Sequence, residues 1–180
     1  MAGAACPVVS KRLQAWTRAN LLTYINTLDP GGSTYHDVGM IWGARMISNG
    51  GIFADSVDTF NSMPVSRHII FMTDGIMDTS HGIYNFMGIE QNDQRVSAGN
   101  WGTNDAELDS RHMQRFRMAC NQAKQLNASI WVIAFGSTLQ QHLLDCASSA
   151  NQASVATDQA TLIARFREIG SNIGALRLTQ

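Results

Sequence analysis

Two short, nearly unbroken apolar runs dominate the hydrophobic pattern of the chain. The first, Ile69–Met72, precedes Asp74-Gly75, and the second, Ile130–Phe135, precedes Gly136. Apolar runs of this length that end at turn residues are typical of strands buried on both faces. The predicted strands span residues 67–73, 129–135 and, as a smaller third strand, 153–156.

The segments around these runs carry apolar residues at helical spacing. Ser10 and Asp158 are natural N-caps for the first and last of these segments. The predicted helices span residues 10–28, 35–48, 106–126, 139–146 and 158–176. The buried side of the last helix is expected to carry Leu162, Ile163, Phe166, Ile169, Ile173 and Leu176.

Alternation of strands and helices indicates a parallel sheet covered on both faces. Right-handed crossovers place the carboxyl ends of the strands at one edge, where folds of this kind bind ligands. We therefore predict an α/β fold, a partial doubly wound parallel sheet flanked by helices. Two segments reach that edge, Gly31–Thr34 before a helix and Thr73–Gly75 after the first strand.

Composition narrows the class of protein without identifying it. The 180 residues suit one domain, and the net charge of -1 gives no electrostatic footprint for nucleic acid or an anionic membrane. No apolar stretch is long enough to span a bilayer, and no signal-peptide pattern is visible at the start. The pattern of a nucleotide-binding glycine-rich loop is also absent from the sequence.

Asp74 and Thr34 are the candidate chemical groups at the predicted edge. A carboxylate placed directly after a buried strand is costly unless it is hydrogen-bonded, paired or bound to a cation. Asp74 could instead cap the following turn, and Thr34 could cap the next helix. As hard oxygen ligands, the two side chains supply part of an octahedral Mg²⁺ or Ca²⁺ site.

The chain resembles the von Willebrand factor A family at Gly32-Ser33-Thr34 and, about forty residues later, at Thr73-Asp74-Gly75. Thr34 matches the threonine of that family's metal-ion-dependent adhesion site, and Asp74 matches its later aspartate. The block Thr34–Arg45 is similar to the signature of TadG-type pilus-assembly proteins. That likeness extends to Cys6-Pro7 and to the segments 143–148 and 176–178.

One motif of the family is missing. No Asp-x-Ser-x-Ser loop occurs in the chain, nor the N-terminal membrane anchor of TadG-type proteins. The resemblance thus implies that residues 1–180 are the carboxyl-terminal portion of a single domain that lacks its first central strand. We expect Mg²⁺, Ca²⁺ or Mn²⁺ to bind only in the intact parent protein, and the unpaired strand 67–73 to favour self-association.

Cys120 and Cys146 are predicted to lie on helices that flank the strand 129–135, so a disulfide between them is geometrically possible. The resemblance implies an exported domain of the periplasm or cell envelope, where such a bridge could form. Free buried thiols are the alternative.

The polar stretch 78–105 has no clear period and leaves from the predicted ligand edge. Its aromatic residues Tyr84, Phe86 and Trp101 suit a protein partner, although a tolerated insertion would look the same. The histidines are scattered, and we expect His36 and His81 to have polar surface or capping roles.

The function that the resemblance implies is a non-enzymatic, extracytoplasmic protein-interaction domain. Its expected role is assembly or adhesion of Flp-type pili, with pilus or cell-envelope proteins as partners. The alternative from a different class is a metal-assisted phosphohydrolase with Asp74 beside Mg²⁺. Asp78 is the only local candidate for the nucleophile or second metal-binding carboxylate that such an enzyme needs. The third hypothesis is that the chain is a fragment without activity of its own.

Overall fold

A three-stranded parallel sheet forms the centre of the molecule. The computed structural model describes residues 8–12, 14–29, 33–53, 58–97 and 105–175. The strands are β3 (Arg67–Thr73), β6 (Ala128–Phe135) and β7 (Ala153–Ala156), in the order β3-β6-β7. The predicted α/β class with a partial, helix-flanked parallel sheet is confirmed, and the three expected strands are present.

The pairing register makes β6 the interior strand. Arg67 of β3 lies opposite Ala128, and the pairing continues without interruption to Thr73 opposite Ala134. On its other side β6 pairs with β7 from Val132 onward. Residues 130–134 of β6 are all buried, which explains their unbroken apolar sequence.

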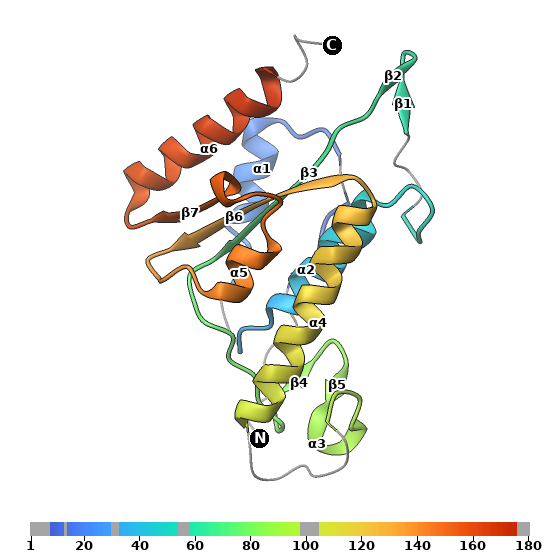
Figure 1. Ribbon diagram of the computed structural model, residues 1–180, viewed down its shortest axis with the longest axis vertical. Helices are drawn as coiled ribbons and strands as arrows, with labels where there is room; N and C mark the ends of the chain where they lie inside the picture. Colours follow the sequence, from blue (N-terminus) through green and yellow to red (C-terminus); the bar gives the residue numbers. More distant parts are fainter. Residues whose placement is uncertain (1–7, 13, 30–32, 54–57, 98–104, 176–180) are drawn as a thin grey trace.

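Helices cover both faces of this sheet (Figure 1). On one face, Met40, Phe116 and Leu143 pack with Ile130 and Val132 in the larger core cluster. On the other face, Ile169 packs against Trp131 and Ile133. The helices of the first face are α2 (His36–Ile47), α4 (Asp105–Gln125) and α5 (Gln141–Cys146), and the helix of the second is α6 (Gln159–Ala175).

Two helical predictions were wrong in detail. Helix α1 (Arg18–Ile25) begins eight residues later than expected, because Thr17 rather than Ser10 caps it by accepting from Asn20 N at 3.2 Å. On α6, Ile163 and Phe166 are 43% and 41% exposed rather than buried. Leu176, the last residue predicted for that face, lies outside the described residues.

The segment predicted as a loop contains short elements. Strands β4 (Tyr84–Asn85) and β5 (Gly88–Ile89) form a small hairpin, and α3 (Glu90–Asp93) follows at once. A second hairpin joins β1 (Thr59–Phe60) to β2 (Met63–Pro64). A single 3-10 turn, η1 (Ala150–Gln152), precedes β7.

Across the described ranges, none of the helices has the length and apolar character needed to cross a membrane.

Candidate functional site

The carboxyl end of β3 brings the two predicted site segments together. Thr34 N donates to Asp78 O at 2.9 Å, and Asp78 N donates to Thr34 O at 3.0 Å. The Thr34 hydroxyl faces Gly75, because a Cβ placed on that glycine would lie 3.6 Å from Thr34 Oγ1. Asp74 and Asp78 are both exposed. We call Thr34, Asp74 and Asp78 the rim.

The rim offers hydroxyl and carboxylate oxygens, the ligand types that Mg²⁺ and Ca²⁺ prefer. Within the described residues, however, no three His, Cys, Asp or Glu side chains gather closely enough to hold a metal ion. Gly31 and Gly32, which precede Thr34 in the predicted loop, lie outside the described residues. The rim residues alone therefore do not make a complete divalent-cation site.

A buried histidine cluster supports the rim from beneath. The Thr73 hydroxyl donates to Gly75 O at 3.1 Å, so its oxygen accepts from Gly75 N at 3.3 Å and from His36 Nε2 at 3.1 Å. Because His36 then carries its proton on Nε2, its Nδ1 accepts from His142 Nε2 at 3.1 Å. These three side chains, Thr73, His36 and His142, are called the histidine cluster below.

Burial disfavours the charged form of both rings of the cluster. Burial, and to a smaller degree the neighbouring His142, lower the pKa of His36 from 6.5 to about 4, although Gly75 and Asp37 act in the opposite direction. Burial also lowers the pKa of His142, as does the nearby Arg117. A proton added to His36 Nδ1 would face the N–H of His142, so the neutral state is the one that holds the turn after β3.

The expectation that His36 has a surface or capping role was wrong. His36 is 3% exposed, and its ring lies edge-on to Phe71 with 5.6 Å between centroids. The N-cap of α2 is Tyr35, and no side chain caps that helix. His36 thus connects α2 to Thr73 of β3 and to His142 of α5 in the interior of the protein.

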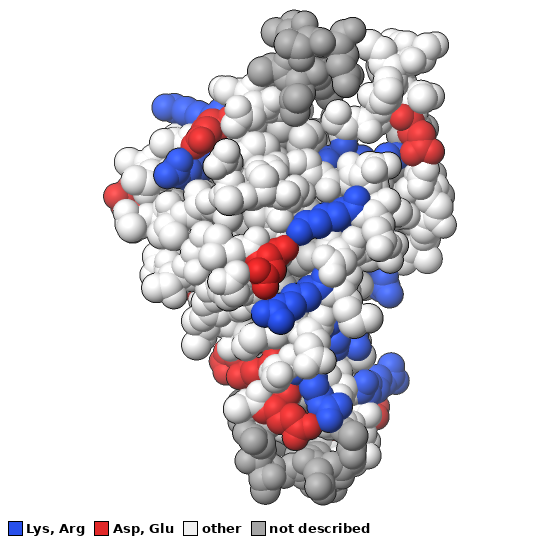
Figure 2. All heavy atoms as spheres, in the orientation of Figure 1, with Lys and Arg blue, Asp and Glu red and all other residues white. Residues whose placement is uncertain are grey.

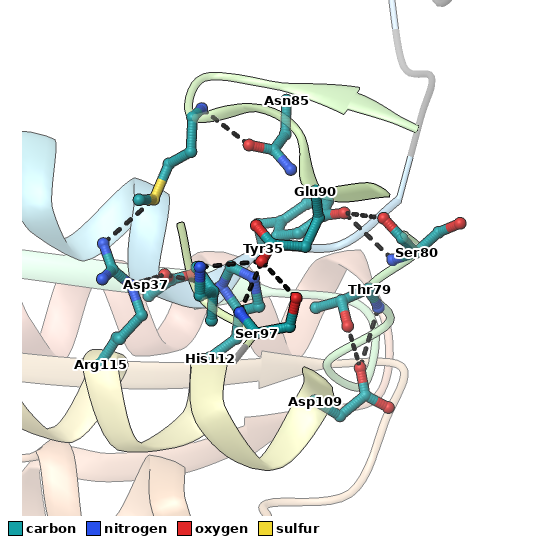
Figure 3. A network of polar contacts seen from close by, with 12 residues as sticks. Tyr35, Asp37, Thr79, Ser80, Asn85, Glu90, Ser97, Asp109, His112 and Arg115 are labelled. Atoms are coloured by element: carbon teal, nitrogen blue, oxygen red, sulfur yellow. Dashed lines mark hydrogen bonds and ion pairs between the residues drawn. The ribbon is translucent and has the colours of Figure 1, made fainter. Parts of the chain in front are cut away.

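A second buried polar group ties α2 to α4 (Figure 3). The Asp37 carboxylate is fully buried, and its Oδ2 accepts from His112 Nδ1 at 2.8 Å and from Arg115 Nε at 3.2 Å. Tyr35 packs against the His112 ring, with 5.0 Å between ring centroids. A buried carboxylate needs such partners, so this group fixes the helix that follows Thr34.

The chain after the rim is fastened to the same helices, as Figure 3 shows. Tyr35 Oη accepts from Ser80 N at 3.1 Å, and Asp109 accepts from both Thr79 N at 2.9 Å and Thr79 Oγ1 at 2.7 Å. Further along, Glu90 accepts from Ser97. Burial of Glu90 opposes its ionisation, but these hydrogen bonds outweigh burial and lower its pKa.

The predicted partner-binding aromatics stand on this fastened segment. Tyr84 in β4 is 65% exposed, and Phe86 in the following turn is 43% exposed. Trp101, the third aromatic residue of that prediction, lies outside the described residues. The segment is tied to α4 at both ends, at Thr79 through Asp109 and at Val96, whose carbonyl accepts from Arg111 Nη1 at 3.0 Å, and Tyr84 and Phe86 project from the hairpin between these contacts.

The two predicted cysteines belong to the larger core cluster. Cys120 of α4 and Cys146 of α5 are joined by a disulfide with an S–S distance of 2.04 Å. Both residues are buried. The bridge fixes α5, the helix that carries His142, against α4.

Sequence reasoning missed most of the buried polar residues. His36, Asp37, His112, Arg115 and His142 were not proposed as a connected system, since they are far apart in the sequence. The one signal was local: Tyr35-His36-Asp37 places three polar residues at the start of a helix whose next six residues are apolar or glycine.

Comparison with known proteins defines the class of fold. No protein-family model matches the chain, and no curated protein matches it either. Among solved structures, the chain is similar to the pilus adhesin SpaC from Lactobacillus rhamnosus GG. The open conformation aligns with a TM-score of 0.54 at 15% identity, and a second crystal form with a TM-score of 0.55 at 13% identity.

Both alignments cover 87% of this chain but 21% of the adhesin. The chain therefore spans about a fifth of the length of the solved structures that it matches. At this level of identity the likeness shows a shared fold.

Proposed function

We propose that this chain is a non-enzymatic protein-interaction domain of the von Willebrand factor A type, similar to TadG-type proteins. Its proposed role is assembly or adhesion of pili at the cell envelope or cell surface. The observation that carries the proposal is the rim, where Thr34 faces Gly75, the residue after the exposed Asp74, at the carboxyl end of β3. The shared fold with a protein described as a pilus adhesin supports the same role.

The contact surface in this proposal combines the rim with the exposed hairpin. Tyr84 and Phe86 supply apolar contact area, and aromatic side chains of this kind commonly dominate protein interfaces. The face drawn in Figure 2 is mostly uncharged, with basic and acidic side chains scattered over it. Recognition of a pilus or cell-envelope protein would therefore depend on these aromatics and on Asp74 more than on net charge.

Cation binding in this proposal needs another segment. Thr34 and Asp74 would hold a divalent ion only together with oxygen ligands supplied from outside the described residues. Such an ion would add a positive charge that an acidic residue of the partner could bind. The contribution of this chain would be to hold the side-chain oxygens of Thr34 and Asp74 in place through the hydrogen bonds of Thr73 and His36.

The proposal is tested by binding to purified pili of the source organism in surface plasmon resonance. Replacing both Tyr84 and Phe86 with alanine is expected to weaken binding by about tenfold or more. Phe60→Ala is the matched control, because Phe60 is also 65% exposed but lies on the other hairpin. Equal loss in both variants, or no binding to pili at all, would refute the proposed role.

The same protein also tests the enzymatic alternative. Turnover of a generic phosphate ester that disappears in Asp74→Asn would support a phosphohydrolase and argue against the proposed non-enzymatic function.

A further inference from the structure

The hairpin of β1 and β2 projects from the body of the molecule, just before β3 begins (Figure 1). Phe60 lies opposite Met63 in its pairing register, so the two side chains share one face of the hairpin. They are 65% and 63% exposed, and neither belongs to a core cluster. Two large apolar side chains thus stand together at a tip, where they do nothing for the fold.

The base of this hairpin is held by several contacts. Asp58 O accepts from Val65 N at 2.9 Å. The Asp58 carboxylate accepts from Arg67 Nη2 at 2.9 Å and from Asn49 Nδ2. Arg67 Nε also donates to Ile47 O, at the end of α2, at 3.1 Å. The hairpin is therefore formed in advance of any contact, and its tip needs little further ordering on binding.

The turn at the tip has an unusual backbone. Its central residues, Asn61 and Ser62, have φ angles of 51° and 64°. Positive φ at both positions makes the tightest kind of hairpin turn, but residues other than glycine adopt it at a cost. This turn is what places Phe60 beside Met63. A strained turn that serves no core contact points to a role outside the fold.

The tip carries no charge. Residues 59–66 contain no Asp, Glu, Lys, Arg or His. The two strands pair with each other, which satisfies backbone groups that an apolar medium could not. A protein interface is usually anchored by Arg, Tyr or Trp side chains, and residues 59–66 have none. This composition therefore suits an apolar medium better than a protein pocket.

Aromatic and cationic side chains stand close to the hairpin base, on α2 and the loop that follows it. Trp42 packs against Phe53 with 6.1 Å between ring centroids. Arg45 lies over the Trp42 ring at 5.1 Å from its centroid, and Arg12 lies over the Phe53 ring at 5.5 Å. Asn49 of this loop is the residue that binds the hairpin base. Aromatic and arginine side chains of this kind settle at the headgroup level of a membrane.

We propose that the β1–β2 hairpin binds the surface of a lipid bilayer. Phe60 and Met63 enter below the headgroups, and the Trp42–Arg45 pair lies at their level. Hydrophobic contact supplies the attraction, since the net charge of the chain is only -1. The rim lies at the other end of β3, so this lipid contact is separate from the proposed protein contact. A protein bound at the rim would leave the hairpin free for the membrane.

The test is flotation of the protein with phosphatidylcholine vesicles in a density gradient. Two apolar side chains give weak, reversible binding, so half of the protein should float at lipid concentrations on the order of millimolar. Vesicles should also slow hydrogen exchange at the amides of residues 59–63. Exchange within β3 should not change, because that strand is not part of the contact.

Two matched double variants separate insertion of the tip from non-specific adhesion. Phe60→Ser with Met63→Ser should weaken lipid binding by about tenfold or more, because both apolar contacts are lost. Met118→Ser with Ile163→Ser removes two apolar side chains, 70% and 43% exposed, from α4 and α6, and should leave lipid binding unchanged. Phe60→Leu keeps an apolar side chain at the tip and should retain lipid binding. Purified pili carry no bilayer, so the serine variant of the tip should bind them normally.

Three results would overturn the proposal. The first is equal flotation of the two double variants when circular dichroism shows both folded. The second is flotation without slower exchange at residues 59–63. The third is a loss of pilus binding in the serine variant of the tip while its flotation is unchanged, since the tip would then be a contact for a protein.

Discussion

The histidine cluster makes the stability of the fold depend on pH in a defined window. His36 has a pKa of about 4 in the folded protein against an ordinary value of 6.5, mainly because it is buried. Between these two values the unfolded chain binds a proton that the folded chain does not. The contribution of His36 to stability is therefore fully present above pH 6.5 and is lost progressively as the pH falls toward 4.

The size of this effect follows from the shift in pKa. The full loss corresponds to roughly 3 kcal/mol, of which about 2 kcal/mol is lost between pH 7.5 and pH 5. With a typical urea dependence for a domain of this size, the unfolding midpoint should fall by about 1 M over that range. Urea titrations followed by circular dichroism at several pH values measure this directly.

The variant His36→Gln isolates the contribution of His36 from that of the carboxylates. It is expected to be less stable at pH 7.5, because Gln cannot bridge His142 and Thr73 with the same geometry. Its midpoint should nevertheless depend less steeply on pH than that of the natural protein. His81→Gln removes one imidazole outside the cluster and serves as the control. An identical pH dependence in His36→Gln and the natural protein would refute the reasoning.

Three further results are expected. Calorimetric titration should show weak or no Mg²⁺ binding, because the rim lacks further carboxylate ligands in the described residues, and micromolar affinity would contradict this. Replacing both Cys120 and Cys146 with serine should lower the free energy of unfolding by about 3.5 kcal/mol, since the bridge spans 26 residues, and an unchanged melting temperature would count against it. Asp37→Ala should cost about 3 kcal/mol by urea unfolding, whereas Glu107→Ala, in an exposed ion pair, should cost less than about 1 kcal/mol, and similar losses would argue against a structural role for the buried carboxylate.

The sheet could be predicted from the sequence because its information is local. The strand at 67–73 was predicted with its observed bounds, and the interior strand differed by one residue at its start. Four-residue β7 was also found, since turn residues enclose it. Strands β3 and β6 each carry a run of consecutive apolar residues, a pattern that is typical of buried strands.

Helix α1 shows where periodicity misleads. The spacing of apolar residues from Leu21 to Leu28 is helical, yet the helix buries none of its residues and begins only at Arg18. A helical stripe predicts a buried face only when another element covers it. On α6, Ile163 and Phe166 were misplaced for the same reason.

The site was less predictable because its geometry is formed by residues distant in the sequence. Thr34 and Asp74 could be named from their positions before a helix and after a strand. The contact between His36 and His142 joins residues 106 positions apart, and the one between Asp37 and His112 joins residues 75 positions apart. Neither pair has a spacing rule that a single sequence reveals.

A continuous series of contacts connects the disulfide to the rim. Cys146 holds α5 to Cys120 of α4, and His142 of the same short helix reaches His36. His36 in turn holds Thr73, whose hydroxyl fixes both the carbonyl and the amide of Gly75, directly beside Asp74. A six-residue helix is too short to keep its position by itself. The bridge therefore supports the position of the exposed Asp74 carboxylate through the side chains of His142, His36 and Thr73. This role explains why hydrogen-bonding side chains occupy a buried site that apolar residues could otherwise fill.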